Sequence, residues 1–188
     1  MTPLSLGIFA SANTTVATSF ESIATVTVGS GGAANVQFTS IPSTYTHLQI
    51  RGIVRTERTG IANDTIYVYF NTDTANQDNY ASHILYGTGA SALAAGNVDN
   101  SGISTSASND STSGVFAGFV IDILDYTNTN KYKTVRTLAG FDNNGNGQVR
   151  LGSTLWLDTS AITTIKFDNA GGNDIAQYSR FALYGIKG

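Results

Sequence analysis

A two-residue period of apolar and polar side chains recurs along most of this chain and constrains its fold more than any other feature. Residues 65–71, for example, alternate Ile66, Val68 and Phe70 with Tyr67 and Tyr69. A period of two places successive side chains on opposite faces of a strand, whereas an amphipathic helix needs a period near 3.6, which no segment shows convincingly. The pattern therefore predicts an all-β protein.

The alternating segments are separated mostly by turn-forming residues. They cover residues 21–28, 34–38, 47–56, 65–71, 81–86, 115–124, 133–141, 148–157, 162–167 and 179–186. Short strands at this spacing predict an antiparallel β-sandwich of jelly-roll type with about 8–10 strands. The chain of 188 residues suits one domain, which we place at residues 21–188.

Composition and charge remove several classes of function. The chain has no cysteine, which excludes disulfides, thiolate catalysis and sulfur-ligated zinc. Its net charge of −3 includes no run of Lys or Arg, so it lacks the clustered positive charge that binds nucleic acid. No apolar run approaches the roughly 20 residues of a membrane span, and we expect no membrane partner.

The sequence contains little that predicts catalysis. The two histidines, His47 and His83, have no carboxylate or second histidine at ligand spacing. Asp122 and Asp125 are three residues apart on a predicted strand, a spacing that sends their side chains to opposite faces. Neither a nucleophile elbow nor a phosphate-binding glycine loop is present. We therefore expect neither an enzyme nor a bound cofactor.

Residues 141–153, FDNNGNGQVRLGS, begin with the spacing of an EF-hand calcium loop. An EF-hand also requires a bidentate glutamate at its twelfth position and a helix on each side. Here the twelfth position is Ser153, and both flanks alternate like strands. Asn-Gly pairs tolerate the positive φ of tight hairpin turns. The segment therefore predicts a β-hairpin turn, with no calcium ion.

Residues 1–20 depart from the alternation and are predicted to form an N-terminal arm. Pro3 and Gly7 disfavour both a helix and a regular strand there. An arm of this kind can attach to a groove in another protein or in a neighbouring subunit through its apolar side chains, which are Leu4, Leu6, Ile8 and Phe9.

Residues 87–114 also break the alternation, because small polar residues dominate them. Loops longer than about 12–15 residues inside a compact domain are usually functional or mobile. We expect a long exposed loop at one end of the sandwich, with at most a short helical turn at residues 90–95.

Residues 115–124 are apolar on both faces of their predicted strand. One face carries Val115, Phe119, Ile121 and Ile123. The opposite face carries Phe116, Val120 and Leu124. A strand that is apolar on both faces must be covered on both, and a two-layer sandwich supplies only one cover. The second cover has to come from a loop, the arm or another subunit, so we expect oligomerisation through Phe116, Val120 and Leu124.

Two segments resemble a group of virion proteins of tailed bacteriophages. In that group a β-sandwich begins with a Ser-Ile-Pro-x-x-Tyr-x-x-Leu-x-Ile-Arg segment and ends with a Phe-x-Leu-Tyr-Gly-Ile strand. The matching positions here are Ser40, Ile41, Pro42, Tyr45, Leu48, Ile50 and Arg51, then Phe181, Leu183, Tyr184, Gly185 and Ile186. The resemblance implies a sandwich over residues 20–188 and carries no active site.

The resemblance implies a structural role in a virion, and proteins of this group are often trimers. A short arm before one sandwich, without a shaft-like repeat, favours a capsid cement or decoration protein. Its partners would be two further copies of itself and the lattice of the major capsid protein, on the outer surface of a virion assembled in the bacterial cytoplasm. The alternative is a distal tail-fibre or tailspike module that binds a host cell-surface glycan through residues 87–114, Trp156 or Tyr67 and Tyr69.

Overall fold

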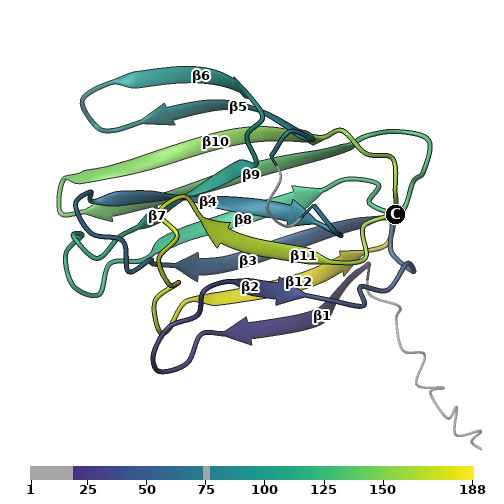
Figure 1. Ribbon diagram of the computed structural model, residues 1–188, viewed down its shortest axis with the longest axis horizontal. Helices are drawn as coiled ribbons and strands as arrows, with labels where there is room; N and C mark the ends of the chain where they lie inside the picture. Colours follow the sequence, from purple (N-terminus) through teal and green to yellow (C-terminus); the bar gives the residue numbers. More distant parts are fainter. Residues whose placement is uncertain (1–18, 74–76) are drawn as a thin grey trace, which may run out of the picture.

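Two antiparallel β-sheets make up the computed structural model, which describes residues 19–73 and 77–188 (Figure 1). No helix occurs in these ranges. The predicted all-β sandwich is therefore confirmed. The described chain forms twelve strands, two more than the ten alternating segments of the sequence.

The larger sheet contains eight strands and presents one face to the core and one to solvent. In spatial order they are β1 (Phe20–Thr27), β12 (Arg180–Ile186), β3 (His47–Val54), β8 (Ala117–Ile123), β9 (Lys133–Asn143), β10 (Asn146–Trp156), β5 (Tyr80–Gly87) and β6 (Ala92–Val98). Figure 1 shows this order from β1 at the bottom to β6 at the top.

The smaller sheet contains four strands and covers the lower and middle part of the larger one (Figure 1). In spatial order they are β2 (Val36–Phe38), β11 (Ile165–Asn169), β4 (Asn63–Phe70) and β7 (Gly102–Ala107). Strand β7 packs against β8, β9 and β10, whereas the β5–β6 hairpin extends beyond the smaller sheet.

The core lies between the inner faces of the two sheets, and in several strands every second residue is buried there. Along the first seven residues of β9, buried and exposed side chains alternate without exception. Aromatic rings fill the centre: Phe70 and Trp156 lie 5.4 Å apart between ring centroids, and Phe167 and Phe181 lie 5.1 Å apart. The two-residue period of the sequence thus becomes one buried face per strand.

The prediction of a long exposed loop at residues 87–114 is wrong, and so is the helical turn at residues 90–95. This segment contains β6 and β7, joined by only a few residues. Strand β6 pairs with β5 along its whole length, and β7 pairs with β4. Backbone hydrogen bonds to a neighbouring strand stabilise both, and these bonds need no apolar pattern in the side chains.

The EF-hand-like residues form a hairpin turn, as predicted. Strands β9 and β10 pair up to Asn143 and Asn146, which leaves Asn144 and Gly145 as a two-residue connection. Both have positive φ, 57° and 91°, as a type I′ turn requires. Gly145 N also donates a hydrogen bond to Oδ1 of Asp142, at 3.0 Å.

The two segments that resemble phage virion proteins meet in space. Strand β3 from the first segment pairs with β12 from the second, with Ile50 opposite Leu183. The ring of Tyr45 lies against Gly185, where a Cβ would stand 2.3 Å from Tyr45 Cγ. The Tyr45 hydroxyl donates a hydrogen bond to Oε2 of Glu21 on β1. Tyr45 therefore fixes the entry to β3 against both β12 and β1, and only glycine fits opposite its ring.

Candidate functional site

A stripe of aliphatic side chains crosses the outer face of the larger sheet. It consists of Val120, Leu138, Leu151 and Leu85, which are successive cross-strand partners on β8, β9, β10 and β5. Val120 is half-buried, and each leucine exposes slightly more than half of its surface. Because four neighbouring strands contribute to it, this apolar stripe is contiguous, unlike the single exposed hydrophobic residues that are normal on a protein surface.

A shallow hollow lies beside the apolar stripe, two residues further along the same strands. The cross-strand row there is Ile53, Gly118, Gly140 and Val149. The two glycines have no side chains, whereas Ile53 and Val149 are exposed at the ends of the row. The resulting hollow has a volume of about 520 Å³ and is bordered by Val120 and Leu138. A protruding apolar side chain of another protein could enter it.

Polar side chains border the other side of the apolar stripe. Gln49 donates a hydrogen bond from Nε2 to Asp122 Oδ1 at 2.7 Å, and Arg136 lies 3.5 Å from the other carboxylate oxygen. An apolar centre with a polar rim is the usual anatomy of a protein–protein contact surface.

The outer face of the smaller sheet differs in character. No large hydrophobic residue is exposed on any of its four strands, all of which lie in the described ranges. Lys166 and Asp168 on β11 form an ion pair at 3.0 Å, and the Lys166 ammonium lies 5.5 Å from the centre of the Tyr69 ring. An apolar contact surface is therefore present on one sheet of the sandwich and not on the other.

The structure places the predicted contact residues in three different situations. Val120 is part of the apolar stripe. Phe116 and Leu124 lie just outside the two ends of β8 and are half-buried, so they do not share one strand face with Val120 as predicted. Strand β8 is shorter than the alternating segment, and its outer face carries Gly118 and Asp122 on either side of Val120. Leu4, Leu6, Ile8 and Phe9 lie outside the described residues.

Sequence reasoning missed the rest of the apolar stripe, because alternation in residues 148–157 indicates the wrong face. One phase carries Val149, Leu151, Leu155 and Leu157, whereas the other is mostly polar. Simple alternation therefore assigns Val149 and Leu151 to the core, but the structure exposes both and buries the opposite phase, which includes Arg150 and Trp156.

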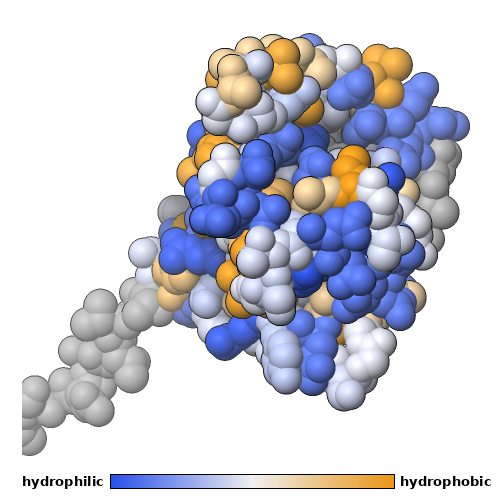
Figure 2. Space-filling model, turned by 90° about the vertical axis from the view of Figure 1, so that its left-hand side faces the viewer, coloured by the Kyte–Doolittle hydropathy of each residue, from blue (hydrophilic) through white to orange (hydrophobic). Residues whose placement is uncertain are grey.

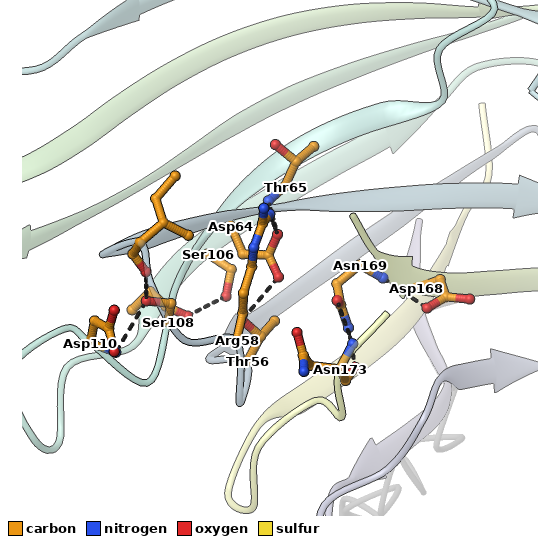
Figure 3. Close-up of polar contacts among 12 residues, drawn as sticks. Thr56, Arg58, Asp64, Thr65, Ser106, Ser108, Asp110, Asp168, Asn169 and Asn173 are labelled. Carbon is orange, nitrogen blue, oxygen red and sulfur yellow. Dashed lines mark hydrogen bonds and ion pairs between the residues drawn. The ribbon is translucent and has the colours of Figure 1, made fainter. Parts of the chain in front are cut away.

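A buried carboxylate at the start of β4 is the most enzyme-like group in the described chain. Asp64 is 2% exposed. Its Oδ1 accepts hydrogen bonds from Arg58 Nη1 at 2.7 Å and from Thr65 N at 2.8 Å, and its Oδ2 accepts one from Thr56 Oγ1 at 3.1 Å (Figure 3). With both oxygens engaged, Asp64 stabilises the junction between the two sheets and is not placed to attack a substrate.

A neighbouring arginine fixes the segment that follows β7. Arg55 donates from Nη1 to the carbonyl oxygens of Thr112 and Val115, and from Nη2 to those of Asn109 and Ser111. Four carbonyl groups of one loop thus converge on a single guanidinium. This arrangement satisfies loop carbonyls that have no strand partner, and its role is structural.

Two other buried cations are also structural. Lys133 Nζ donates to the carbonyl oxygens of Asn128, Lys131 and Thr159 at 2.7, 3.1 and 2.9 Å. Arg150 donates from Nη2 to Gly102 O, which joins β10 to β7. Burial lowers the pKa of both side chains. Their sequence positions gave no indication of burial.

The residues considered for catalysis or glycan stacking differ in their exposure. Trp156 is 1% exposed, and its Nε1 donates to Asp73 Oδ2 at 2.7 Å. Tyr69 is buried as well. Asp125 N donates to Nδ1 of His47, while the His83 ring packs over Gly96 on the neighbouring strand. Trp156 and Tyr69 are therefore part of the core, whereas His83 is exposed and Tyr67 is half-buried.

The described ranges contain no group of three or more His, Cys, Asp or Glu side chains that could hold a metal ion. In the same ranges no helix is long and apolar enough to cross a membrane.

Comparisons with protein-family models, with curated protein sequences and with solved structures gave no match to this chain.

Proposed function

We propose that the protein is a structural component of a tailed-bacteriophage virion, a capsid cement protein that binds the outer capsid surface as a trimer. The observation that carries this proposal is the apolar stripe with its adjoining hollow on the outer face of the larger sheet. Such a surface is stable in water when another protein covers it, either a second copy of the chain or a subunit of the capsid lattice.

The order of the strands supports the proposal. Without the hairpins β5–β6 and β9–β10, the remaining strands pair as β1-β12-β3-β8 and β2-β11-β4-β7. We infer that this core is a jelly roll, in which the strands named B to I pair as B-I-D-G and C-H-E-F. The two hairpins are then insertions that extend one sheet. Jelly rolls are common among viral capsid and lectin domains, so the inference agrees with the resemblance of the sequence to virion proteins.

The inserted hairpins supply three of the four side chains in the apolar stripe, namely Leu138, Leu151 and Leu85. Complete burial of a leucine contributes about 1.5–3 kcal/mol, and these leucines are already half-buried. Each would add about 1 kcal/mol on contact. In a trimer, three copies of this weak surface act together, because binding of one raises the effective concentration of the others.

The location of the protein in the particle tests the proposed function. Quantitative mass spectrometry of purified virions should find hundreds of copies in each particle, and labelled antibodies should cover the shell in electron micrographs. A handful of copies at the tail would overturn the assignment to the capsid and support the fibre-tip alternative.

Two substitutions test the role of the apolar stripe. Leu138→Lys and Leu151→Lys place a charge at its centre while leaving the core face of each strand unchanged. We expect the trimer to dissociate or the capsid to lose the protein, while each chain keeps its folded sandwich. Gln37→Lys, on an exposed position of the smaller sheet, is the matched control. Light scattering measures trimer formation, and co-sedimentation measures binding to capsids. Leucine variants that form trimers and bind capsids as the wild type does would contradict the proposal.

A further inference from the structure

A groove at one end of the sandwich lies beside the tip of the β9–β10 hairpin. Phe141 and Gln148 are directly paired across this hairpin, and Asn143 is paired with Asn146 at its tip. Together with Asn63 at the start of β4, these residues line a cavity of about 360 Å³. Ala62, Thr88, Ala90 and Gly147 complete its lining. This volume lies within the range of small-molecule binding sites.

A second hollow continues the first. It has a volume of about 420 Å³ and shares Thr88, Phe141, Gly147 and Gln148 with the first cavity. The two together form a groove that runs past the hairpin toward the turn at Gly87–Gly89. Two adjoining hollows of these volumes offer room for more than one sugar ring.

The lining combines one aromatic ring with four carboxamides. Phe141 is half-buried, and a Cβ at Gly147 would lie 2.2 Å from Phe141 O, so no side chain fits at that position. Phe141 packs partly against the core, and Asn63, Asn143, Asn146 and Gln148 line the cavity with it. A carboxamide both donates and accepts hydrogen bonds, as does a hydroxyl group of a sugar. The face of an aromatic ring complements the C–H face of a pyranose.

Three of these amides are free to bind a ligand. Within residues 19–73 and 77–188, the side chains of Asn63, Asn146 and Gln148 make no hydrogen bond to protein. The fourth amide is held in place, because Asn143 Oδ1 accepts a hydrogen bond from Thr112 N at 2.7 Å. Thr112 belongs in turn to the loop fixed by Arg55. The groove is therefore rigid on one side and has unused donors and acceptors on the other.

The electrostatic character of the groove selects against charged ligands. The first cavity has no Asp, Glu, Lys, Arg or His among its described lining residues. The adjoining hollow contains Asp142, whose Oδ1 is engaged by Gly145 N. A phosphate or a carboxylate would find no countercharge in either hollow. Figure 2 looks onto this end of the molecule, where hydrophilic residues predominate and hydrophobic ones are scattered.

We propose that this groove, formed by Phe141 and the amides of Asn63, Asn143, Asn146 and Gln148, binds a neutral oligosaccharide. Phe141 stacks on one sugar ring, and the amides bind the hydroxyl groups of that ring and its neighbour. The first cavity, which holds the amides, shares no lining residue with the hollow beside the apolar stripe, whereas the adjoining second hollow shares Gly140 and Val149 with it.

Titration of the full-length protein with three neutral trisaccharides tests the proposal. Maltotriose, cellotriose and tri-N-acetylchitotriose serve as probes, and trigalacturonate is the charged counterpart. Saturation-transfer difference spectra followed by calorimetry should show binding of at least one neutral trisaccharide at millimolar concentration. Binding of trigalacturonate should be weaker. If no neutral probe binds, or if the charged one binds more tightly, the proposal is overturned.

Substitutions then locate the binding to the groove. Asn146→Ala and Gln148→Ala each remove one side chain that has no hydrogen-bond partner in the described protein, so the fold should be retained while affinity falls about tenfold. Phe141→Leu keeps an apolar side chain in contact with the core and should also weaken binding. Gln37→Ala, which removes an exposed amide from β2, is the control and should bind normally. Unchanged affinity in all three groove variants would place the sugar elsewhere and refute the assignment.

Discussion

Strands β6 and β7 come from the same stretch of small polar residues, yet their environments are opposite. All seven residues of β6 are exposed, and all six residues of β7 are buried. The more apolar sequence is the exposed one: β6 reads ALAAGNV, whereas the buried β7 reads GISTSA.

The difference follows from the position of each strand. Strand β6 ends the larger sheet and extends beyond the smaller one, so neither of its faces is covered (Figure 1). Strand β7 lies against β8, β9 and β10, and small side chains allow the two sheets to approach closely there. Ser104 and Ser106 satisfy their hydroxyls on backbone carbonyls of β7 itself. Burial is thus set by the layer in which a strand lies, and hydrophobicity alone does not predict it.

The largest expected effect compares one aliphatic residue from each strand. Ile103→Ala on β7 removes a side chain that is 1% exposed and should lower the free energy of unfolding by about 2–5 kcal/mol. Leu93→Ala on β6 removes one that is 44% exposed and should cost less than about 1 kcal/mol. Urea unfolding followed by tryptophan fluorescence measures both. Equal losses of unfolding free energy in the two variants would show that β6 is covered in solution. The difference in burial between β6 and β7 would then not hold.

The junction between β6 and β7 predicts that the free energy of unfolding depends on pH. Asn100 N, between β6 and β7, donates to the carbonyl of Tyr80, and burial raises the pKa of the Tyr80 hydroxyl above its ordinary value near 10. The unfolded chain loses this proton above about pH 10 and the folded chain retains it, so stability is constant below that pH and falls above it.

The variant Tyr80→Phe isolates this contribution. At high pH the free energy of unfolding of the wild type should fall by up to about 1.4 kcal/mol per pH unit more than that of the variant. A tyrosine titrates at about pH 9–12. If the curves of unfolding free energy against pH are parallel for the two proteins over this range, Tyr80 does not contribute to the pH dependence. The variant also removes the hydroxyl that accepts a hydrogen bond from Phe70 N, which shifts its curve downward at every pH without changing the slope.

The smallest expected effect has the opposite sign. Thr105 on β7 is 1% exposed, and its Oγ1 has no hydrogen-bond partner in the described part of the chain. Thr105→Val replaces this hydroxyl with a methyl group of similar size and should raise the free energy of unfolding by about 1 kcal/mol. Thr134→Val, on an exposed position of β9, should have little effect. A loss of stability in Thr105→Val would reveal a partner for this hydroxyl.

Sequence alone predicted the sandwich and ten of its strands because alternation and turn residues are local signals. The Asn144–Gly145 turn was predictable for the same reason, since only its own two residues need positive φ. Strands β6 and β7 were not predictable, because long-range pairing with β5 and β4 creates them and no side-chain pattern records that pairing.

The candidate site was only partly predictable. Apolar residues in both phases identified Val120, whereas in β10 the apolar phase faces solvent, so alternation alone would have assigned Leu151 to the core. The groove could not be predicted from the sequence, because Asn63 and Phe141 are far apart along the chain and only the fold brings them together. Phe116 and Leu124 were assigned to a contact face because the true ends of β8 depend on its partners, β3 and β9.

The cluster of carbonyls on Arg55 has a consequence for how the segment after β7 would resist proteases. Residues 108–116 are rich in Ser, Thr, Asn and Gly, so by composition they resemble a cleavable linker. To enter a protease active site, however, this segment would have to release all four carbonyl groups from the guanidinium. Cleavage then depends on a cooperative local opening, whose free energy sets the fraction of time for which the loop is accessible. The hydrogen bonds of one arginine thus protect from proteolysis a segment whose composition is typical of a flexible linker.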